Sequence, residues 1–385
     1  MRKSTQAGET CPHRPPCPGC PRFGAGGIDP GARDALAALA HEAGIELGAT
    51  VEGSPFAYRV RARLAVRGRA TSPKIGLFQE GSHRIVDIPR CPIHHPLVNE
   101  VAAALRAAIR ATGTPPYADR THRGLVRYLQ VVVERPSQRA QVVVVGNGTD
   151  AAPLRPLLDA LAAALGAQLH SLWWNGQPEP TNVILGPYWE HVAGGEAVRE
   201  RLGGADVFFP PGAFGQANLD LAERIIAQVA AWVPDGARVL ELHAGCGAIG
   251  LGLAPRVRSL VMNEVSPAGL AGLELGRAAL PPHAAARTRV LAGEASAHAA
   301  AIAEADVVIA DPPRKGLESA VLDALAAQPP KRLALVSCNP DACVREVRRL
   351  RAAGLALVAL TPYALFPHTS HVETVALLER GVDAQ

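Results

Sequence analysis

The stretch ELHAGCGAIG (residues 241–250) decides the fold of the C-terminal half of the chain. It ends an apolar run with a glycine-rich turn, and Gly245, Gly247 and Gly250 follow the G-x-G-x-x-G pattern. A tight glycine turn between a strand and a helix lets backbone N–H groups approach a bound ligand closely. The same pattern also fits a simple strand-to-helix turn that binds nothing, because such short motifs are weak predictors on their own.

Further apolar runs follow this turn at regular intervals, and stretches of helical composition separate most of them. Counting the run before the turn, the strand-like segments are residues 237–242, 259–264, 287–292, 305–310, 332–337, 355–360 and 372–378. Near-continuous apolar strands that alternate with helices are typical of a parallel sheet covered on both faces. We therefore predict a doubly wound α/β domain over residues 206–385.

The preceding part of the chain has a different pattern. Residues 58–76 have a strand-like pattern, residues 130–145 have the pattern of a hairpin, and residues 97–111 and 151–165 have helical spacing. Strands and helices mix there without strict alternation, which predicts an α+β central domain over residues 31–205. Residues 1–30 are rich in Pro, Gly and Cys and are expected to form a separate leader.

The composition excludes several classes of protein. Of the 385 residues, 48% are hydrophobic and 19% are charged, as in a globular protein of two or three domains. The sequence has neither an apolar run of about 18 residues, which could span a membrane, nor an apolar segment near its start that would direct secretion. We therefore expect a cytoplasmic protein. Its net charge of +4 permits an anionic partner without requiring one.

Acidic residues near the ends of the predicted strands indicate what the glycine turn binds. Glu241 lies in the strand before the turn, Glu264 ends the next strand, and Asp311 follows the fourth strand. Open α/β sheets bind their ligands at the carboxyl ends of the strands. The two glutamates suit a ligand with an ammonium group and a ribose, such as S-adenosylmethionine.

Two further segments place reactive side chains at the same edge. Cys338 follows the fifth strand in VSCNP (residues 336–340), before a predicted helix whose amino terminus would favour its thiolate. Glu373 follows two histidines in FPHTSHVE (residues 366–373) and is a candidate base. If the last strand runs antiparallel to the others, Glu373 lies on the same edge as Asp311 and Cys338, and three loops converge on one cleft.

The seven cysteines are unevenly distributed, which argues against a disulfide framework. Four of them precede residue 100. Cys11, Cys17 and Cys20 are clustered, and Cys91 is remote from them in the sequence. This arrangement fits a 4Fe–4S site better than the paired Cys-x2-Cys knuckles of structural zinc. Four cysteines without a metal are the alternative.

An alternating run of arginines is a candidate contact for nucleic acid. A period of two places its members on one face of a strand: Arg59, Arg61, Arg63, Arg67 and Arg69. Such a face can track phosphates, but a charged strand face is more often simply solvated.

Together, the motifs resemble the RNA 5-methyluridine (uracil-C5) methyltransferases, over nearly the whole chain from Cys11 onward. The matching segments are FGQAN (residues 214–218), the turn after Glu241, DPPRKG (residues 311–316), SCNP (residues 337–340) and FPHTSHVE. The resemblance implies a Rossmann-like sheet of seven strands with an antiparallel last strand. It also implies that Cys338 is the nucleophile that adds to C6 of uracil, and that Glu373 removes the C5 proton.

The resemblance further implies methyl transfer from S-adenosylmethionine to a uridine of RNA, with 23S rRNA favoured. The implied cofactor contacts are Gln216, Glu241, Gly245, Gly247, Glu264 and Asp311, with Glu294 where relatives often carry Asn or Asp. Cys11, Cys17, Cys20 and the remote Cys91 correspond to the 4Fe–4S ligands of the rRNA-modifying members, and Arg59, Arg61 and Arg63 become expected RNA contacts. No protein partner is implied.

The chain also departs from the family pattern. Many members begin with an RNA-binding TRAM domain, whereas only ten residues precede Cys11 here, so we expect the central domain to supply RNA affinity. Three alternatives stay open at this point. They are a methyltransferase for the T-loop uridine of tRNA, a cytosine-C5 methyltransferase, and a non-catalytic iron–sulfur factor that binds RNA.

Overall fold

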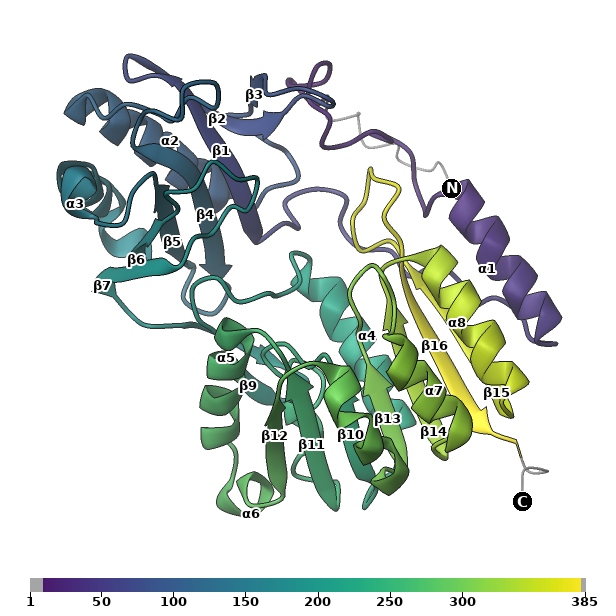
Figure 1. The fold of residues 1–385 in the computed structure, drawn as a ribbon. Helices are drawn as coiled ribbons and strands as arrows, with labels where there is room; N and C mark the ends of the chain where they lie inside the picture. Colours follow the sequence, from purple (N-terminus) through teal and green to yellow (C-terminus); the bar gives the residue numbers. More distant parts are fainter. Residues whose placement is uncertain (1–9, 382–385) are drawn as a thin grey trace, which may run out of the picture. The chain divides into compact units, whose positions relative to one another are not determined.

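The computed structural model describes residues 10–381, which form two compact units (Figure 1). The described part of the first unit comprises residues 10–25 and 54–198, and that of the second comprises residues 26–53 and 199–381. These divisions differ from the expected boundaries at residues 30 and 205. The larger difference is at the start, where residues 26–53 belong to the C-terminal unit.

The second unit is built on a seven-stranded sheet with the order β12-β11-β10-β13-β14-β16-β15. Its strands are β10 (Arg238–Leu242), β11 (Ser259–Glu264), β12 (Thr288–Ala292), β13 (Val307–Ala310), β14 (Arg332–Ser337), β15 (Leu355–Tyr363) and β16 (Glu373–Arg380). Strands β10 to β14 pair in parallel, and β16 pairs antiparallel with both β14 and β15. The predicted doubly wound sheet and its antiparallel last strand are confirmed.

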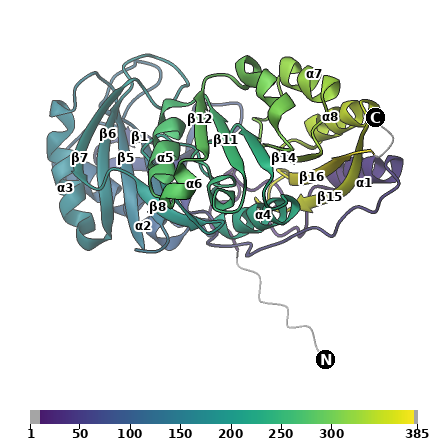
Figure 2. The same cartoon turned by 90° about the horizontal axis from the view of Figure 1, so that it is seen from below.

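Helices lie on both faces of this sheet, and Figure 2 shows α7 and α8 on one side and α4 on the other. The helices of the unit are α1 (Pro30–Glu42), α4 (Leu219–Trp232), α5 (Pro267–Ala278), α6 (Pro282–Ala285), α7 (Ser319–Ala327) and α8 (Pro340–Ala352). Apolar residues of α1, α7 and α8 join those of the central strands in one core. This coverage explains why the strands carry near-continuous apolar runs.

Helix α1 explains why residues 26–53 belong to the C-terminal unit. The Asp29 carboxylate accepts a hydrogen bond from the Ala32 N–H and caps the helix. The apolar face of the helix buries Leu36 and Leu39 in the core of the second unit. Glu42, the last residue of α1, accepts a hydrogen bond of 2.9 Å from Arg348 of α8. The apolar stripe of α1 therefore has its partner in the C-terminal unit.

The first unit contains a second sheet of seven strands, in the order β3-β2-β1-β4-β5-β6-β7. Its strands are β1 (Arg61–Arg69), β2 (Ser72–Phe78), β3 (Ile85–Asp87), β4 (Val126–Glu134), β5 (Arg139–Gly146), β6 (Leu169–Gly176) and β7 (Tyr188–Gly194). The expected hairpin is confirmed as β4 and β5, and the two expected helices are α2 (Pro96–Thr112) and α3 (Arg155–Leu165).

Two strands, β8 (Val198–Leu202) and β9 (Ala205–Phe209), form a separate two-stranded sheet where the first unit ends and the second resumes. Within residues 10–381, no helix is long and apolar enough to cross a membrane.

Candidate active site

The register of the second sheet places Cys338 beside Glu373. Strand β16 pairs antiparallel with β14, and Ser337 lies opposite Thr374. Cys338 is the next residue after Ser337, and Glu373 immediately precedes Thr374, so the two side chains leave neighbouring strands at one edge. Asp311 follows β13, which pairs with β14 on its other side. The predicted convergence of the three loops is confirmed.

These three side chains interact electrostatically. The pKa of the Cys338 thiol is raised to about 11, mainly by burial and next by the carboxylates of Glu373 and Asp311. The positive charge of Arg314 opposes this shift. The free protein therefore holds this thiol protonated at neutral pH. The expectation that the amino terminus of α8 favours the thiolate is wrong for the free protein, because burial and two carboxylates outweigh the helix dipole.

Glu373 is only 2% exposed, and its Oε1 atom has no hydrogen-bond partner within residues 10–381. The pKa of Glu373 is raised well above its ordinary value, mainly by burial and next by the Asp311 carboxylate. The positive charge of Arg314 partly opposes this shift. Burial also raises the pKa of Asp311, to about 7. Both carboxyl groups therefore gain a proton more readily than exposed acids do, and a cationic ligand would favour their ionised forms.

Helix α8 holds the loop that contains Arg314. The Asn339 side chain donates to the carbonyl oxygen of Arg314 (3.0 Å), and the Glu346 carboxylate accepts from the N–H of Leu317 (2.9 Å). Gly316 has a φ of +87°, and a Cβ atom there would lie 1.7 Å from Glu346 Oε1. Glu346 therefore positions this loop. Sequence reasoning missed Glu346, because nothing in the helical pattern separates a buried glutamate from a solvated one.

The glycine turn after β10 is fixed by Glu264, at the end of β11. One oxygen of the Glu264 carboxylate accepts from the Gly245 N–H (2.8 Å), and the other accepts from the Ser266 N–H (2.6 Å). Gly245 and Gly247 have φ angles of +57° and +83°, which glycine adopts readily. A Cβ atom on Gly245 would meet nothing within 4 Å, so space is open beside the turn.

Glu241 connects this turn to the site around Cys338. The pKa of Glu241 is raised to about 8, mainly by burial and next by the negative charge of Asp311. Glu264 also raises this pKa, whereas a hydrogen bond from the Gly250 amide lowers it. The side chain is buried, and its Oε2 atom has no hydrogen-bond partner within residues 10–381. A buried carboxylate with an unpaired oxygen is costly. The arrangement therefore fits a cationic ligand that supplies the missing partner.

Two predicted cofactor contacts lie outside this group of carboxylates. Gln216 is half-buried in the segment before α4 and makes no hydrogen bond within the described chain. The same segment approaches the glycine turn, because Cys246 Sγ lies 3.9 Å from the Phe214 carbonyl oxygen. Glu294 is exposed, and its charge acts on the half-buried His243.

The four early cysteines gather in the first unit. The pKa of Cys20 is raised to about 11. Burial is the main cause, and the nearby thiols add to it: Cys91, Cys17 and Cys11. The backbone of Cys91 is fixed by two hydrogen bonds with the Asn99 side chain, of 3.2 and 3.0 Å. All seven cysteines are free thiols. As placed, however, no three His, Cys, Asp or Glu side chains of residues 10–381 form a group that could hold a metal ion.

The expected phosphate track of arginines is only partly present. Arg63 is exposed and donates to Gln130 (2.7 Å), whereas Arg59 and Arg61 are half-buried. Arg67 is only 5% exposed and forms an ion pair with Asp119 (2.6 Å). The prediction is therefore wrong for Arg67, because the loop that carries Asp119 occupies its guanidinium.

Comparisons with known proteins agree with this geometry. A family model described as tRNA (Uracil-5-)-methyltransferase matches residues 300–381, which contain Asp311, Cys338 and Glu373. A protein of Protochlamydia amoebophila, named as an RNA methyltransferase, is 35% identical over 335 residues, which cover 86% of this chain and 88% of that protein. The chain belongs to the RNA uracil-5-methyltransferase family.

One further relative supports the family assignment, and one crystal structure shares the fold of this methyltransferase. A Gloeobacter violaceus protein, also named as an RNA methyltransferase, is 35% identical over 332 residues, covering 85% of this chain and 71% of that protein. The crystal structure of Pyrococcus abyssi tRNA (uracil-54, C5)-methyltransferase, in complex with S-adenosyl-L-homocysteine, has the same fold, with a TM-score of 0.74 and 24% identity. That match covers 90% of this chain and 82% of the Pyrococcus chain.

Proposed function

We propose that this methyltransferase transfers the methyl group of S-adenosylmethionine to C5 of a uridine in RNA. The observation that carries the proposal is the continuous group of acidic side chains from Glu241 through Asp311 to Glu373, which ends beside Cys338. S-adenosylmethionine carries an ammonium and a sulfonium group. The positive charge of either group would offset the negative charge of the carboxylates whose oxygens have no hydrogen-bond partner within residues 10–381. When bound, S-adenosylmethionine supplies an electrophilic methyl group.

The residues around the glycine turn are proposed to hold this cofactor. Glu241 supplies an unpaired carboxylate oxygen, and Glu264 keeps the turn in place through its two backbone hydrogen bonds. Gly245 and Gly247 allow close approach of the ligand to the backbone. Gln216 and Glu294 remain proposed contacts on the strength of the family resemblance.

Cys338 is proposed to act as the nucleophile. Its thiolate would add to C6 of uracil and convert the C5–C6 double bond to an enolate. C5 would then take the methyl group as the methyl–sulfonium bond breaks, which releases S-adenosylhomocysteine. Glu373 then takes the C5 proton, and elimination of the thiolate restores the double bond. A bound cationic cofactor would offset the charge of Asp311 and Glu373 and remove part of the field that keeps the thiol protonated. Cys338 would then lose its proton to solvent more readily in the loaded site than in the free protein. The target base must leave its stack to reach Cys338.

We propose 23S rRNA as the substrate, because the four cysteines resemble those of the rRNA-modifying members. A tRNA uridine is the second candidate, and the descriptions of the matching family model and of the Pyrococcus enzyme favour it. Both substrates imply action in the cytoplasm.

A covalent trap tests the reaction. A fluorine at C5 cannot leave as a proton, so RNA containing 5-fluorouridine is expected to stop as a Cys338 adduct that survives denaturing electrophoresis and requires the cofactor. Trapping of RNA containing 5-fluorocytidine instead would mean cytosine methylation. Trapping of neither RNA would contradict the catalytic proposal and favour a non-catalytic factor that binds RNA.

The cysteines of the first unit are proposed to hold a 4Fe–4S cluster, with Cys11, Cys17, Cys20 and Cys91 as ligands. Their thiols are gathered from two distant segments, and thiolates are the usual ligands of such clusters. Protein purified without oxygen is expected to contain about four irons per chain. Cys17→Ser should lower this content, whereas Cys343→Ala, in the core of the second unit, should not. A wild-type protein without iron after reconstitution would contradict the proposal.

A further inference from the structure

Two loops of the first unit are joined by a buried arginine of β4. The guanidinium of Arg127 donates to the carbonyl oxygens of Gln177 (2.5 Å), Glu179 (2.7 Å) and Thr181 (3.1 Å). It also lies over the Tyr117 ring, 4.4 Å from the ring centroid. Arg127 is only 2% exposed, which is rare for an arginine that forms no ion pair within residues 10–381. It therefore fixes the loop of residues 117–124 against the loop of residues 177–187.

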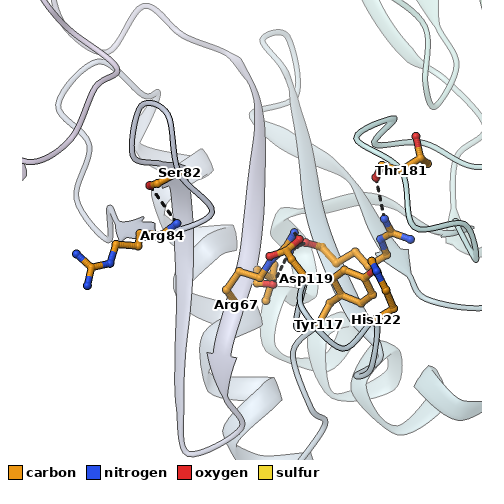
Figure 3. A network of polar contacts seen from close by, with 9 residues as sticks. Arg67, Ser82, Arg84, Tyr117, Asp119, His122 and Thr181 are labelled. Carbon is orange, nitrogen blue, oxygen red and sulfur yellow. Dashed lines mark hydrogen bonds and ion pairs between the residues drawn. The ribbon is translucent and has the colours of Figure 1, made fainter.

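The 117–124 loop is held by a second buried arginine (Figure 3). Arg67 forms a two-pronged ion pair with Asp119, with distances of 2.6 and 2.8 Å. Its guanidinium lies over three aromatic rings, including that of Tyr117 at 5.2 Å. The Tyr117 hydroxyl and His122 Nδ1 share a hydrogen bond of 2.7 Å. Few conformations are therefore open to the loop.

The rigid loop presents two cationic side chains to solvent. Arg120 and Arg123 are exposed, and neither side chain makes an ion pair or hydrogen bond within residues 10–381. The acidic residue of the loop, Asp119, is already occupied by Arg67. The loop thus carries two exposed guanidinium groups on a fixed backbone, which suits the recognition of phosphates.

The 177–187 loop leads to an exposed aromatic side chain. The Gln177 side chain donates to the carbonyl oxygens of Val183 (3.2 Å) and Leu185 (3.3 Å), and Val183 itself is 62% exposed. Trp189 follows in β7, at the edge of the sheet, and is 39% exposed. An exposed tryptophan on a fixed edge strand can stack on a base.

The sheet register places Trp189 on the same row as the start of β4. Tyr128 pairs with Val145, Val145 pairs with Asn175, and Asn175 pairs with Trp189. Three strand spacings separate the ends of this row, which corresponds to about 14 Å. The basic loop and the tryptophan therefore lie at one end of the same sheet.

We propose that the two loops and Trp189 form one RNA-binding surface, in which Arg120 and Arg123 bind backbone phosphates and Trp189 stacks on an unpaired base. The inference rests on the proposed RNA substrate and adds residues to Arg59, Arg61 and Arg63. Phosphate contacts and base stacking together are the usual means of holding single-stranded RNA. The two buried arginines order the surface in advance, which lowers the entropic cost of binding.

The test measures binding of a fluorescein-labelled RNA hairpin with a uridine-containing loop to the full-length protein, over a series of salt concentrations. Arg120→Ala/Arg123→Ala is expected to reduce the slope of log affinity against log salt by about 1.4 to 1.8. Trp189→Ala should weaken binding by about 5- to 150-fold at constant slope, and Trp189→Phe should restore most of the affinity. Arg110→Ala, an exposed arginine at the end of α2, should change neither quantity.

The maximal rate of methyl transfer separates this inference from the proposed function. Both the double variant and Trp189→Ala are expected to raise KM for RNA without changing kcat. An unchanged salt slope in the double variant would overturn the phosphate contacts, and unchanged affinity of Trp189→Ala would overturn the stacking. If the wild-type protein binds RNA with the expected dependence on these residues but methylates none, the proposed function fails and the surface stands.

Discussion

Cys338→Ala is expected to lower methyl transfer to RNA by a factor on the order of 10⁴ to 10⁶, the range seen when other enzymes lose their nucleophile. Without the thiolate, C5 of uracil keeps its double bond to C6 and is too weak a nucleophile to attack a methyl group. The side chain lies between β14 and α8 and is partly exposed, so its removal leaves the core intact. The measurement is incorporation of labelled methyl groups into RNA.

Two controls separate a lost nucleophile from a damaged site. Cys338→Ala should bind S-adenosylmethionine as the wild type does, because Cys338 is proposed to contact the uridine and not the cofactor. Cys343→Ala, which removes a neighbouring buried thiol of α8, should retain activity. If Cys338→Ala methylates RNA at more than about one hundredth of the wild-type rate, the covalent mechanism is wrong.

The second large effect is expected from Glu241→Gln, which removes the buried carboxyl group beside the glycine turn and with it the charge that this group could carry when a cationic ligand is bound. The affinity for S-adenosylmethionine should fall on the order of 10²-fold, as is common when one partner of a buried charged contact is removed. The stability of the free protein, in contrast, should increase on this substitution. An unpaired buried carboxylate destabilises the free protein at alkaline pH, so the variant should be more stable than the wild type there.

The pH dependence follows from the raised pKa of Glu241. Between the ordinary value of 4.5 and the folded value of about 8, the folded protein retains a proton that the unfolded chain releases. The wild type therefore loses stability as pH rises through this window, and Glu241→Gln should lose less. Thermal unfolding at pH 5 and pH 8, with and without S-adenosylmethionine, measures both effects. Glu304→Gln, an exposed substitution in the same unit, is the control. If S-adenosylmethionine stabilises Glu241→Gln as much as it stabilises the wild type, Glu241 does not contact the cofactor.

Sequence patterns located the C-terminal sheet well. The expected strands at residues 259–264 and 332–337 have the observed bounds, because strands buried on both faces require continuous apolar runs. The convergence of Asp311, Cys338 and Glu373 could also be predicted, since the carboxyl ends of parallel strands share one edge. The residue pattern alone left the direction of the last strand open. The family resemblance implied an antiparallel strand, and the pairing of β14 with β16 confirms it.

Other properties depend on contacts between distant segments. A period of two placed Arg67 on a strand face, but nothing in that pattern reveals that Asp119, 52 residues later, occupies its guanidinium. The charge state of Cys338 depends on two carboxylates from other loops, so the helix that follows it was a poor guide. Helix α1 has a short apolar stripe whose partner, the core beneath α8, lies some 300 residues further along the chain.

We propose that the acidic edge of the second unit serves methyl transfer to uridine, and this proposal can be tested on the isolated reaction. Its most direct test is nucleoside mass spectrometry on unmodified 23S rRNA and tRNA transcripts, incubated with the purified protein and S-adenosylmethionine that carries a deuterated methyl group. We expect labelled 5-methyluridine, with 23S rRNA as the labelled RNA. A label found in 5-methylcytidine, or in no nucleoside of either RNA, would contradict the proposal.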